Sequence, residues 1–384
     1  MKSVKSRVRY IAYVSLATLI LLEICLRIYN PIPLRIKGDK IVLPINQKMI
    51  FSNDFDCFDK QIIHTKNDLG FRGKPKPDDL ENYLSIVAIG GSTTECFFVS
   101  DDKVWTQVLE DSLQNHVSKV WVNNAGLNGH STFGHKILLQ DLVAPLHPDY
   151  VLFLIGINEL DRDDLGEFDK KNLKGFHKAE SSGLLKNIIL FLANNTEIGN
   201  LTFNLSKSLA ARNKRIFIDQ VLELNPSDTL SIAQEYQQKL LADQKELIPA
   251  YLHRVARLDS ICRSNDIKPV FITQPLLYGF GTDPETHTDL ATYRSSQGMN
   301  GSLYWQKLEL YNDALRSFCK DKNDCVIDLA ALMPKDSRYF YDEMHFSNAG
   351  SIEVGQIIYS QLFKYLAENT PIAGNNHDRK IDFQ

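Results

Sequence analysis

Five short apolar runs, separated by segments with helical periodicity, constrain the fold more than any other feature of this sequence. The runs are rich in β-branched residues and read LSIVAIG (84–90), KVWVNNAG (119–126), DYVLFLIG (149–156), KPVFITQP (268–275) and DCVIDLA (324–330). Strands that are apolar on both faces and alternate with helices are typical of a parallel sheet covered on both sides. The pattern therefore predicts an α/β fold, with a doubly wound parallel sheet of about five strands and helices on both faces.

The segments between the runs differ in how well they follow this alternation. Helical spacing is clear after the first run, at Trp105, Val108, Leu109 and Leu113. Residues 160–265 break the rhythm and are interpreted as a helical insertion and a candidate lid. Within the insertion, 228–258 has the pattern of an amphipathic helix. Residues 278–302 are rich in Gly, Thr and Ser and predict a long loop beside the ligand-binding edge.

The N-terminus has the pattern of a membrane anchor. Four basic residues precede an apolar run that is just long enough to cross a bilayer; they are Lys2, Lys5, Arg7 and Arg9. No small-x-small cleavage site follows the run, and Glu23 and Arg27 stand where one is expected, which disfavours a cleaved signal peptide. The basic residues place the N-terminus in the cytoplasm and the rest of the chain in the periplasm or outside the cell.

These patterns divide the chain into an anchor (1–32), an N-terminal extension (33–83), a large domain (84–370) and a flexible tail (371–384). The 43 Lys+Arg residues nearly balance the 47 Asp+Glu residues, which argues against a nucleic-acid partner. There are 6 cysteines without metal-ligand spacing, so we expect neither a metal nor another cofactor. Cys319 and Cys325 are near enough in sequence to form a disulfide, but the connectivity stays open.

Polar residues follow the predicted strands at the points where the strands end. Ser92 follows the first run, Gly129 the second and Asn158 the third, while Asp342 and His345 lie beyond the fifth. Ligands bind at this edge of a parallel sheet. His345 can act as a base toward Ser92, and Asp342 can orient the imidazole. The N–H groups of Ser92 and Gly129 and the amide of Asn158 can donate to a developing oxyanion.

These blocks resemble those of the SGNH hydrolases, also called GDSL esterases/lipases. The blocks are GGSTT with Ser92, NAGLNGHST with Gly129, GINEL with Asn158 and DEMHFSNAG with Asp342 and His345. The resemblance covers residues 84 to about 366 and implies a flavodoxin-like sheet and a Ser-His-Asp esterase. Two positions depart from the family pattern, Gly91 and Glu159, where Asp is usual. NDLGFRG (67–73) resembles a motif of membrane-anchored members; we expect a tight turn and a short edge element there, without a catalytic role.

Each of these residues also has a purely structural interpretation. Ser92 can cap a helix, Asn158 can be a turn residue, and Asp342 and His345 can cap the final helix. We expect Glu95 to be exposed at a helix start, and His130 and His135 to lie at the surface or behind the site. An α/β-hydrolase elbow is excluded because Thr94 stands where that motif needs Gly.

The sequence therefore predicts a membrane-anchored serine esterase that removes a short, acetyl-like acyl group from an extracytoplasmic substrate. The expected partner is an acylated carbohydrate, such as a cell-envelope or exported glycan, or a lipid. The alternatives are an O-acyltransferase that passes the acyl group to a sugar hydroxyl, a lipid esterase, and a catalytically silent glycan-binding or scaffold protein.

Overall fold

The computed structural model describes residues 4–28, 36–37, 40–41, 43–161, 192, 196–199, 201–202 and 221–369. The chain divides into two compact units, residues 1–44 with 170–219 and residues 45–169 with 220–384, and each is described by itself. The predicted tail (371–384) and most of the candidate lid between 162 and 220 lie outside the described residues. The predicted domain boundaries stay predictions.

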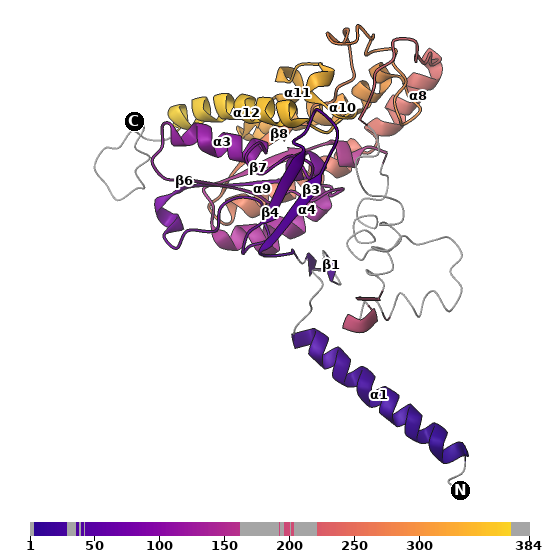
Figure 1. Cartoon of the computed structure of the whole chain (residues 1–384). Helices are drawn as coiled ribbons and strands as arrows, with labels where there is room; N and C mark the ends of the chain where they lie inside the picture. The colour runs from indigo at the N-terminus through magenta and orange to yellow at the C-terminus, as the bar shows by residue number, and fades with distance from the viewer. Residues whose placement is uncertain are drawn as a thin grey trace. The chain divides into compact units, whose positions relative to one another are not determined.

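A parallel sheet of five strands forms the centre of the larger unit, as the sequence predicts (Figure 1). Its strands are β5 (Leu84–Gly90), β6 (Val120–Asn124), β7 (Tyr150–Ile155), β8 (Lys268–Thr273) and β9 (Cys325–Ile327). Their order across the sheet is β6-β5-β7-β8-β9, and every pair is parallel. Every residue of β5, β6 and β7 is buried, which explains why these strands are mostly apolar in sequence.

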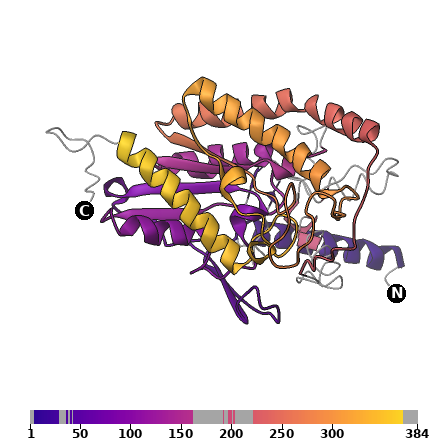
Figure 2. The same ribbon diagram turned by 90° about the horizontal axis from the view of Figure 1, so that it is seen from above.

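Right-handed crossovers decide which helix covers which face. The chain moves one way from β5 to β6 through α3 (Trp105–Gln114), and the opposite way through α4 (Thr132–Leu138), α9 (Ile248–Arg263) and α10 (Gly301–Lys322). The last helix, α12 (Asn348–Asn369), packs beside α3, and α4 packs beside α9 (Figure 1). Figure 2 shows α12 crossing over the sheet. Connections leave β5 and β7 toward opposite faces, so a crevice opens at their carboxyl ends.

One predicted helix is two helices in the structure. The amphipathic pattern over 228–258 becomes α8 (Gln234–Lys245) and α9, separated at 246–247. Pro249 occupies the first turn of α9, where its missing N–H costs nothing, whereas inside a continuous helix it would clash with the preceding turn. The prediction of a single helix over 228–258 was therefore wrong. Pro249, which is visible in the sequence, marks the start of the second helix.

Further elements complete the described part. They are α1 (Val4–Ile28), β1 (Ile36–Lys37), β2 (Lys40–Ile41), β3 (Gln47–Ser52), β4 (Gln61–Lys66), η1 (Leu80–Asn82), α2 (Ser92–Glu95), η2 (Leu139–Val143), η3 (Ala144–Leu146), η4 (Ile157–Glu159), α11 (Leu329–Leu332) and η5 (Ser337–Tyr339). After β4, the Asn67 side chain accepts the N–H groups of Leu69 and Phe71 in a tight turn. Arg72 then bridges Asn124 of β6, which confirms the short edge element.

Helix α1 in the smaller unit is apolar and exposed. Its segment Arg9–Ile28 is long and apolar enough to cross a membrane. The polar exception, Glu23, bonds Arg27 at 2.9 Å and accepts the N–H groups of Glu197 and Ile198 at 3.0 and 3.1 Å. These bonds satisfy a carboxylate that would otherwise be costly in an apolar helix. The helix is compatible with a membrane anchor or a signal sequence, and its orientation stays a prediction.

Candidate active site

The predicted site residues converge at the carboxyl end of the sheet. Ser92 begins α2 directly after β5, Gly129 lies in the turn after β6, and Asn158 lies in η4 after β7. Asp342 and His345 occupy the segment that leads into α12. Since β5 and β7 are neighbours whose connections diverge, Ser92 and Asn158 lie on the two sides of the same crevice.

A continuous row of hydrogen bonds joins three of these side chains. His345 Nε2 lies 2.7 Å from Ser92 Oγ, and His345 Nδ1 lies 2.6 Å from Asp342 Oδ2. The other carboxylate oxygen, Oδ1, accepts the N–H groups of Met344 and His345 at 2.9 and 2.8 Å. Two backbone N–H groups thus fix one oxygen of the Asp342 carboxylate while the other oxygen holds the imidazole. This arrangement can move the proton of the Ser92 hydroxyl to His345.

The environment of Asp342 keeps it ionised. Burial by itself raises the pKa of Asp342, but the hydrogen bonds from His345 and from the N–H of Met344 outweigh it, and its pKa lies below the usual value. Tyr341 stacks on the His345 ring with centroids 5.5 Å apart and an interplanar angle of 15°. An ionised carboxylate and a stacked ring both favour one orientation of the imidazole.

The alternative that Asp342 and His345 cap α12 does not hold. Ser347 takes that position, because its Oγ accepts the N–H of Gly350 at 3.1 Å. Asp342 instead accepts N–H groups within its own turn. Neighbouring Glu343 is buried and accepts both the N–H and the hydroxyl of Ser296, which attaches the predicted loop over 278–302 to this segment.

Gly91 is a departure from the family pattern that has a structural reason. A Cβ at this position would lie 2.3 Å from Asn158 Nδ2, so any side chain would displace that amide. Asn158 Nδ2 donates to the His130 carbonyl at 2.9 Å, which orients its second hydrogen. Gly129 has a φ of +75° and no heavy atom within 4 Å of its Cβ position, so it is exposed and left-handed.

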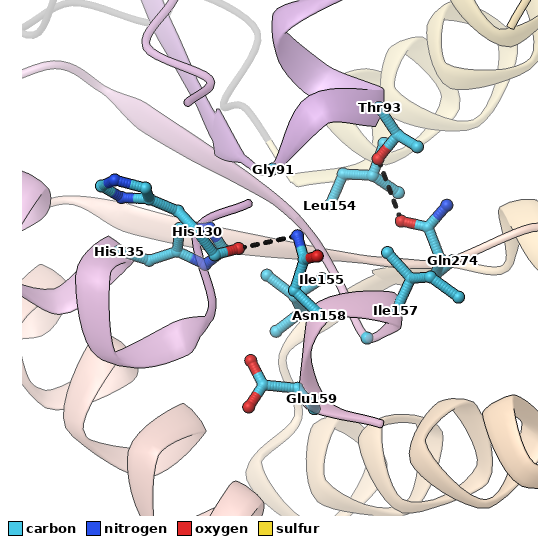
Figure 3. Close-up of a pocket in the computed structure, with 11 residues that line it drawn as sticks. Gly91, Thr93, His130, His135, Leu154, Ile155, Ile157, Asn158, Glu159 and Gln274 are labelled. Atoms are coloured by element: carbon cyan, nitrogen blue, oxygen red, sulfur yellow. Dashed lines mark hydrogen bonds between the residues drawn. The ribbon is translucent and has the colours of Figure 1, made fainter. Parts of the chain in front are cut away.

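A small pocket lies beside Asn158 (Figure 3). Its lining includes Gly91, Thr93, His130, His135, Glu159 and Gln274. Thr93 donates to the Gln274 side chain at 3.1 Å, which connects the ends of β5 and β8. His135 is buried in the wall of the pocket, and burial lowers its pKa to about 3. His135 is therefore neutral near pH 7. The histidine that is hydrogen-bonded to Ser92 is His345.

Glu95 corrects the sequence interpretation. The sequence predicts Glu95 at the surface, but its side chain is buried, with the residue 4% exposed, and its Oε2 accepts the N–H of Asn128 at 2.7 Å. Lys66 Nζ, from the end of β4, lies 3.7 Å from its other oxygen. A lysine 29 positions earlier in the chain gives no local signal that it will neutralise this carboxylate.

Sequence reasoning also missed the role of Arg72. This side chain is 1% exposed and donates to the carbonyls of Glu95, Cys96 and Val99 and to the Asp101 carboxylate. These acceptors follow Ser92 in the chain, so the NDLGFRG segment braces the turn after the serine. The NDLGFRG motif is visible in the sequence, but the groups that accept hydrogen bonds from Arg72 are mostly backbone carbonyls. Every residue has such a carbonyl, so the sequence gives no sign of which ones Arg72 contacts.

The structure shows the state of the cysteines. All six cysteines, including Cys319 and Cys325, are free thiols in the structure. Within the described ranges, no cluster of His, Cys, Asp and Glu has the geometry of a metal site. Burial raises the pKa of Cys96 to about 12, so the cysteine nearest Ser92 in the chain is not a nucleophile at neutral pH.

The central part of the chain matches a known protein family. Residues 88–351 match the GDSL-like Lipase/Acylhydrolase family. Among solved structures, a catalytic mutant of an acetylxylan esterase from Geobacillus stearothermophilus is 13% identical, with 73% of this chain and 95% of that chain covered at a TM-score of 0.37. A GDSL-like lipase from Bacteroides thetaiotaomicron is 11% identical, with 77% and 92% covered at a TM-score of 0.35. A search of curated proteins found no match.

Proposed function

From the premise that the chain belongs to the GDSL-like lipase/acylhydrolase family and is a serine hydrolase, we propose that it cleaves esters with Ser92, His345 and Asp342 as its catalytic residues. The observation that carries this proposal is the pair of hydrogen bonds, 2.7 and 2.6 Å long, that links the three side chains. A serine hydroxyl becomes a nucleophile only when a base takes its proton, and His345 Nε2 is the atom in contact with it.

The proposed reaction has two steps. Ser92 Oγ bonds to the acyl carbon while His345 Nε2 takes the hydroxyl proton, and the same nitrogen then protonates the departing alcohol. Water attacks the acyl-serine, His345 takes its proton, and the carboxylic acid leaves as Ser92 regains a hydrogen. Asp342 stays ionised throughout and holds the Nδ1–H. The N–H groups of Ser92 and Gly129 and the Asn158 amide receive the oxyanion in both steps.

The proposed substrate is a short, acetyl-like ester on an extracytoplasmic molecule such as a cell-envelope or exported glycan. Support comes from α1, whose segment Arg9–Ile28 is long and apolar enough to cross a membrane and is preceded by basic residues that favour a cytoplasmic N-terminus. The same acyl-serine can be attacked by a sugar hydroxyl instead of water, which would make the protein an O-acyltransferase. The two reactions share every residue named above and differ only in the acceptor.

The proposal is tested on the full chain purified in detergent. A fluorophosphonate probe is added, the adduct is located by peptide mass spectrometry, and p-nitrophenyl acetate, butyrate and octanoate are then titrated. We expect an adduct on Ser92 and fastest turnover of acetate. Ser92→Ala should abolish labelling and lower kcat by about 10⁶-fold, because triad members act as a unit. Ser360→Ala, an exposed serine on α12, is the matched control.

Two outcomes would overturn parts of the proposal. A folded protein that is not labelled at Ser92 contradicts the catalytic assignment and supports a glycan-binding or scaffold role. Turnover that rises with a sugar acceptor, with the acyl group recovered on the sugar, replaces the hydrolase with an acyltransferase.

A further inference from the structure

The segment that carries Gly129 is held at both ends by buried carboxylates. Glu95 Oε2 accepts the N–H of Asn128 at 2.7 Å, and Glu159 Oε1 accepts the N–H of Thr132 at 2.6 Å. Glu95 is 4% exposed and Glu159 is 1% exposed. The two bonds attach the segment to the serine turn on one side and to the Asn158 turn on the other, where Figure 3 shows Glu159 next to Asn158.

Each carboxylate is neutralised by a cation from another part of the fold. Lys66 at the end of β4 lies 3.7 Å from Glu95 Oε1, and both side chains are buried. Arg254 of α9 donates from Nη2 to Glu159 Oε2 at 3.0 Å and from Nε to Thr132 Oγ1 at 2.8 Å. A buried carboxylate needs a partner to remain charged, so each cation maintains the bond that its carboxylate makes to the segment.

Packing alone does not hold the exposed tip of this segment in place. Asn128 and Gly129 are exposed, and Gly129 has no heavy atom within 4 Å of its Cβ position. A glycine-containing turn at the surface has many accessible backbone conformations, and bonds at its ends reduce them. The direction of the Gly129 N–H therefore depends on the hydrogen bonds around the turn, which are those to Glu95 and Glu159 and the bond from the His130 N–H to the Leu127 carbonyl.

Resting on the proposed function, we propose that the Lys66–Glu95 and Arg254–Glu159 pairs are positioning residues that preorganise the oxyanion hole. Glu95 lies in the helix that begins with Ser92, and Glu159 directly follows Asn158. The two pairs thus fix the relative positions of the three donors, together with the bond from Asn158 to the His130 carbonyl. Donors aimed before the reaction lower the barrier because they need no reorganisation when charge develops.

Arg254 belongs to the insertion (160–265) that the sequence predicts as a candidate lid, and the positioning role is a different one. Arg254 lies 95 positions beyond Glu159 in the chain, on α9. It reaches the site because α9 packs against α4, whose first residue is Thr132. Its guanidinium bonds both Glu159 and Thr132, which a single ammonium group cannot reproduce in the same geometry.

The test uses Arg254→Met in the full chain, with kcat and KM measured on p-nitrophenyl acetate. We expect kcat to fall roughly 10- to 100-fold while KM changes less than about threefold, since a misplacement near 1 Å acts on the transition state. The control Arg263→Met removes an arginine from the same helix, where it bonds Asp259 and Asp324, and should leave kcat unchanged.

A double variant separates positioning from general stability. If Arg254 acts through the oxyanion donors, Arg254→Met and Asn158→Ala impair the same oxyanion hole, so their combined loss in kcat should be smaller than the product of the two single losses. Lys66→Met should show the same split of kcat from KM. Arg254→Lys should recover part of the lost rate because it retains the charge.

The decisive outcomes are distinct. A folded Arg254→Met with a wild-type kcat, or losses that multiply fully with Asn158→Ala, would overturn the positioning role. If Arg254→Met does not fold, Thr132→Val is used in its place, because it removes only the hydroxyl that Arg254 Nε contacts. The positioning role requires that Thr132→Val lowers kcat. Absence of fluorophosphonate labelling at Ser92 in the wild-type protein would instead indicate that the proposed function has failed.

Discussion

Asp342→Asn tests the proposed proton transfer because the structure determines how the new amide would be oriented. Oδ1 of Asp342 accepts two N–H groups, from Met344 and His345, while Oδ2 faces His345 Nδ1 alone. An asparagine keeps its oxygen toward the two donors and turns its NH₂ toward Nδ1. His345 must then present a lone pair at Nδ1 and carry its proton on Nε2, where it cannot accept one from Ser92.

The size of the effect follows from the cost of turning that amide around. The reversed amide would restore the correct tautomer but would place NH₂ against two backbone N–H groups. Leaving two such groups unsatisfied costs about 2–6 kcal/mol, at roughly 1–3 kcal/mol each. At about 1.4 kcal/mol per factor of ten, the reversed form supports roughly 30- to 10⁴-fold less activity. We therefore expect kcat to fall within this range.

The assay is kcat on p-nitrophenyl acetate across pH, with thermal unfolding measured in parallel. Asp313→Asn, an exposed change on α10, serves as the control. The pKa of Asp342 is lowered in the folded state, so its ionisation stabilises the fold above its unfolded pKa, and this contribution is lost as pH falls through the folded value. The variant should thus be less stable than wild type near neutral pH, and this difference should disappear in strong acid. A loss in kcat below about threefold would refute the reasoning on tautomers.

Three further predictions test the oxyanion donor, the buried arginine and the topology. Asn158→Ala should lower kcat by roughly a hundredfold or more with little change in KM, and an effect confined to KM would contradict an oxyanion role. Arg72→Met should lower the free energy of unfolding by about 3–5 kcal/mol, because Asp101 and three carbonyls lose their donor. An unchanged melting temperature would contradict the idea that Arg72 stabilises the turn after Ser92. A reporter enzyme fused after Gln384 should be active outside the cytoplasm, whereas cytoplasmic activity would reverse the predicted orientation.

The sequence by itself determined the sheet and the residues at its edge. All five apolar runs contain strands, because burial on both faces of a parallel sheet favours apolar side chains at most positions, and such a run is visible in any local window. The positions of Ser92, Asp342 and His345 were equally visible, since each follows a predicted strand within a short motif. Their convergence follows from the parallel topology, which brings the carboxyl ends of all strands to one edge.

Only the tertiary structure decided which polar residues are buried and with what partner. The sequence predicts Glu95 as an exposed helix residue and Glu159 as a variant of the family block, whereas in the structure Lys66 and Arg254 lie beside them. A local pattern reports the chemistry of a residue and the face it occupies. It does not report which distant segment will pack beside that residue. For a carboxylate, this neighbour decides whether the group is hydrated at the surface or forms an ion pair in the interior.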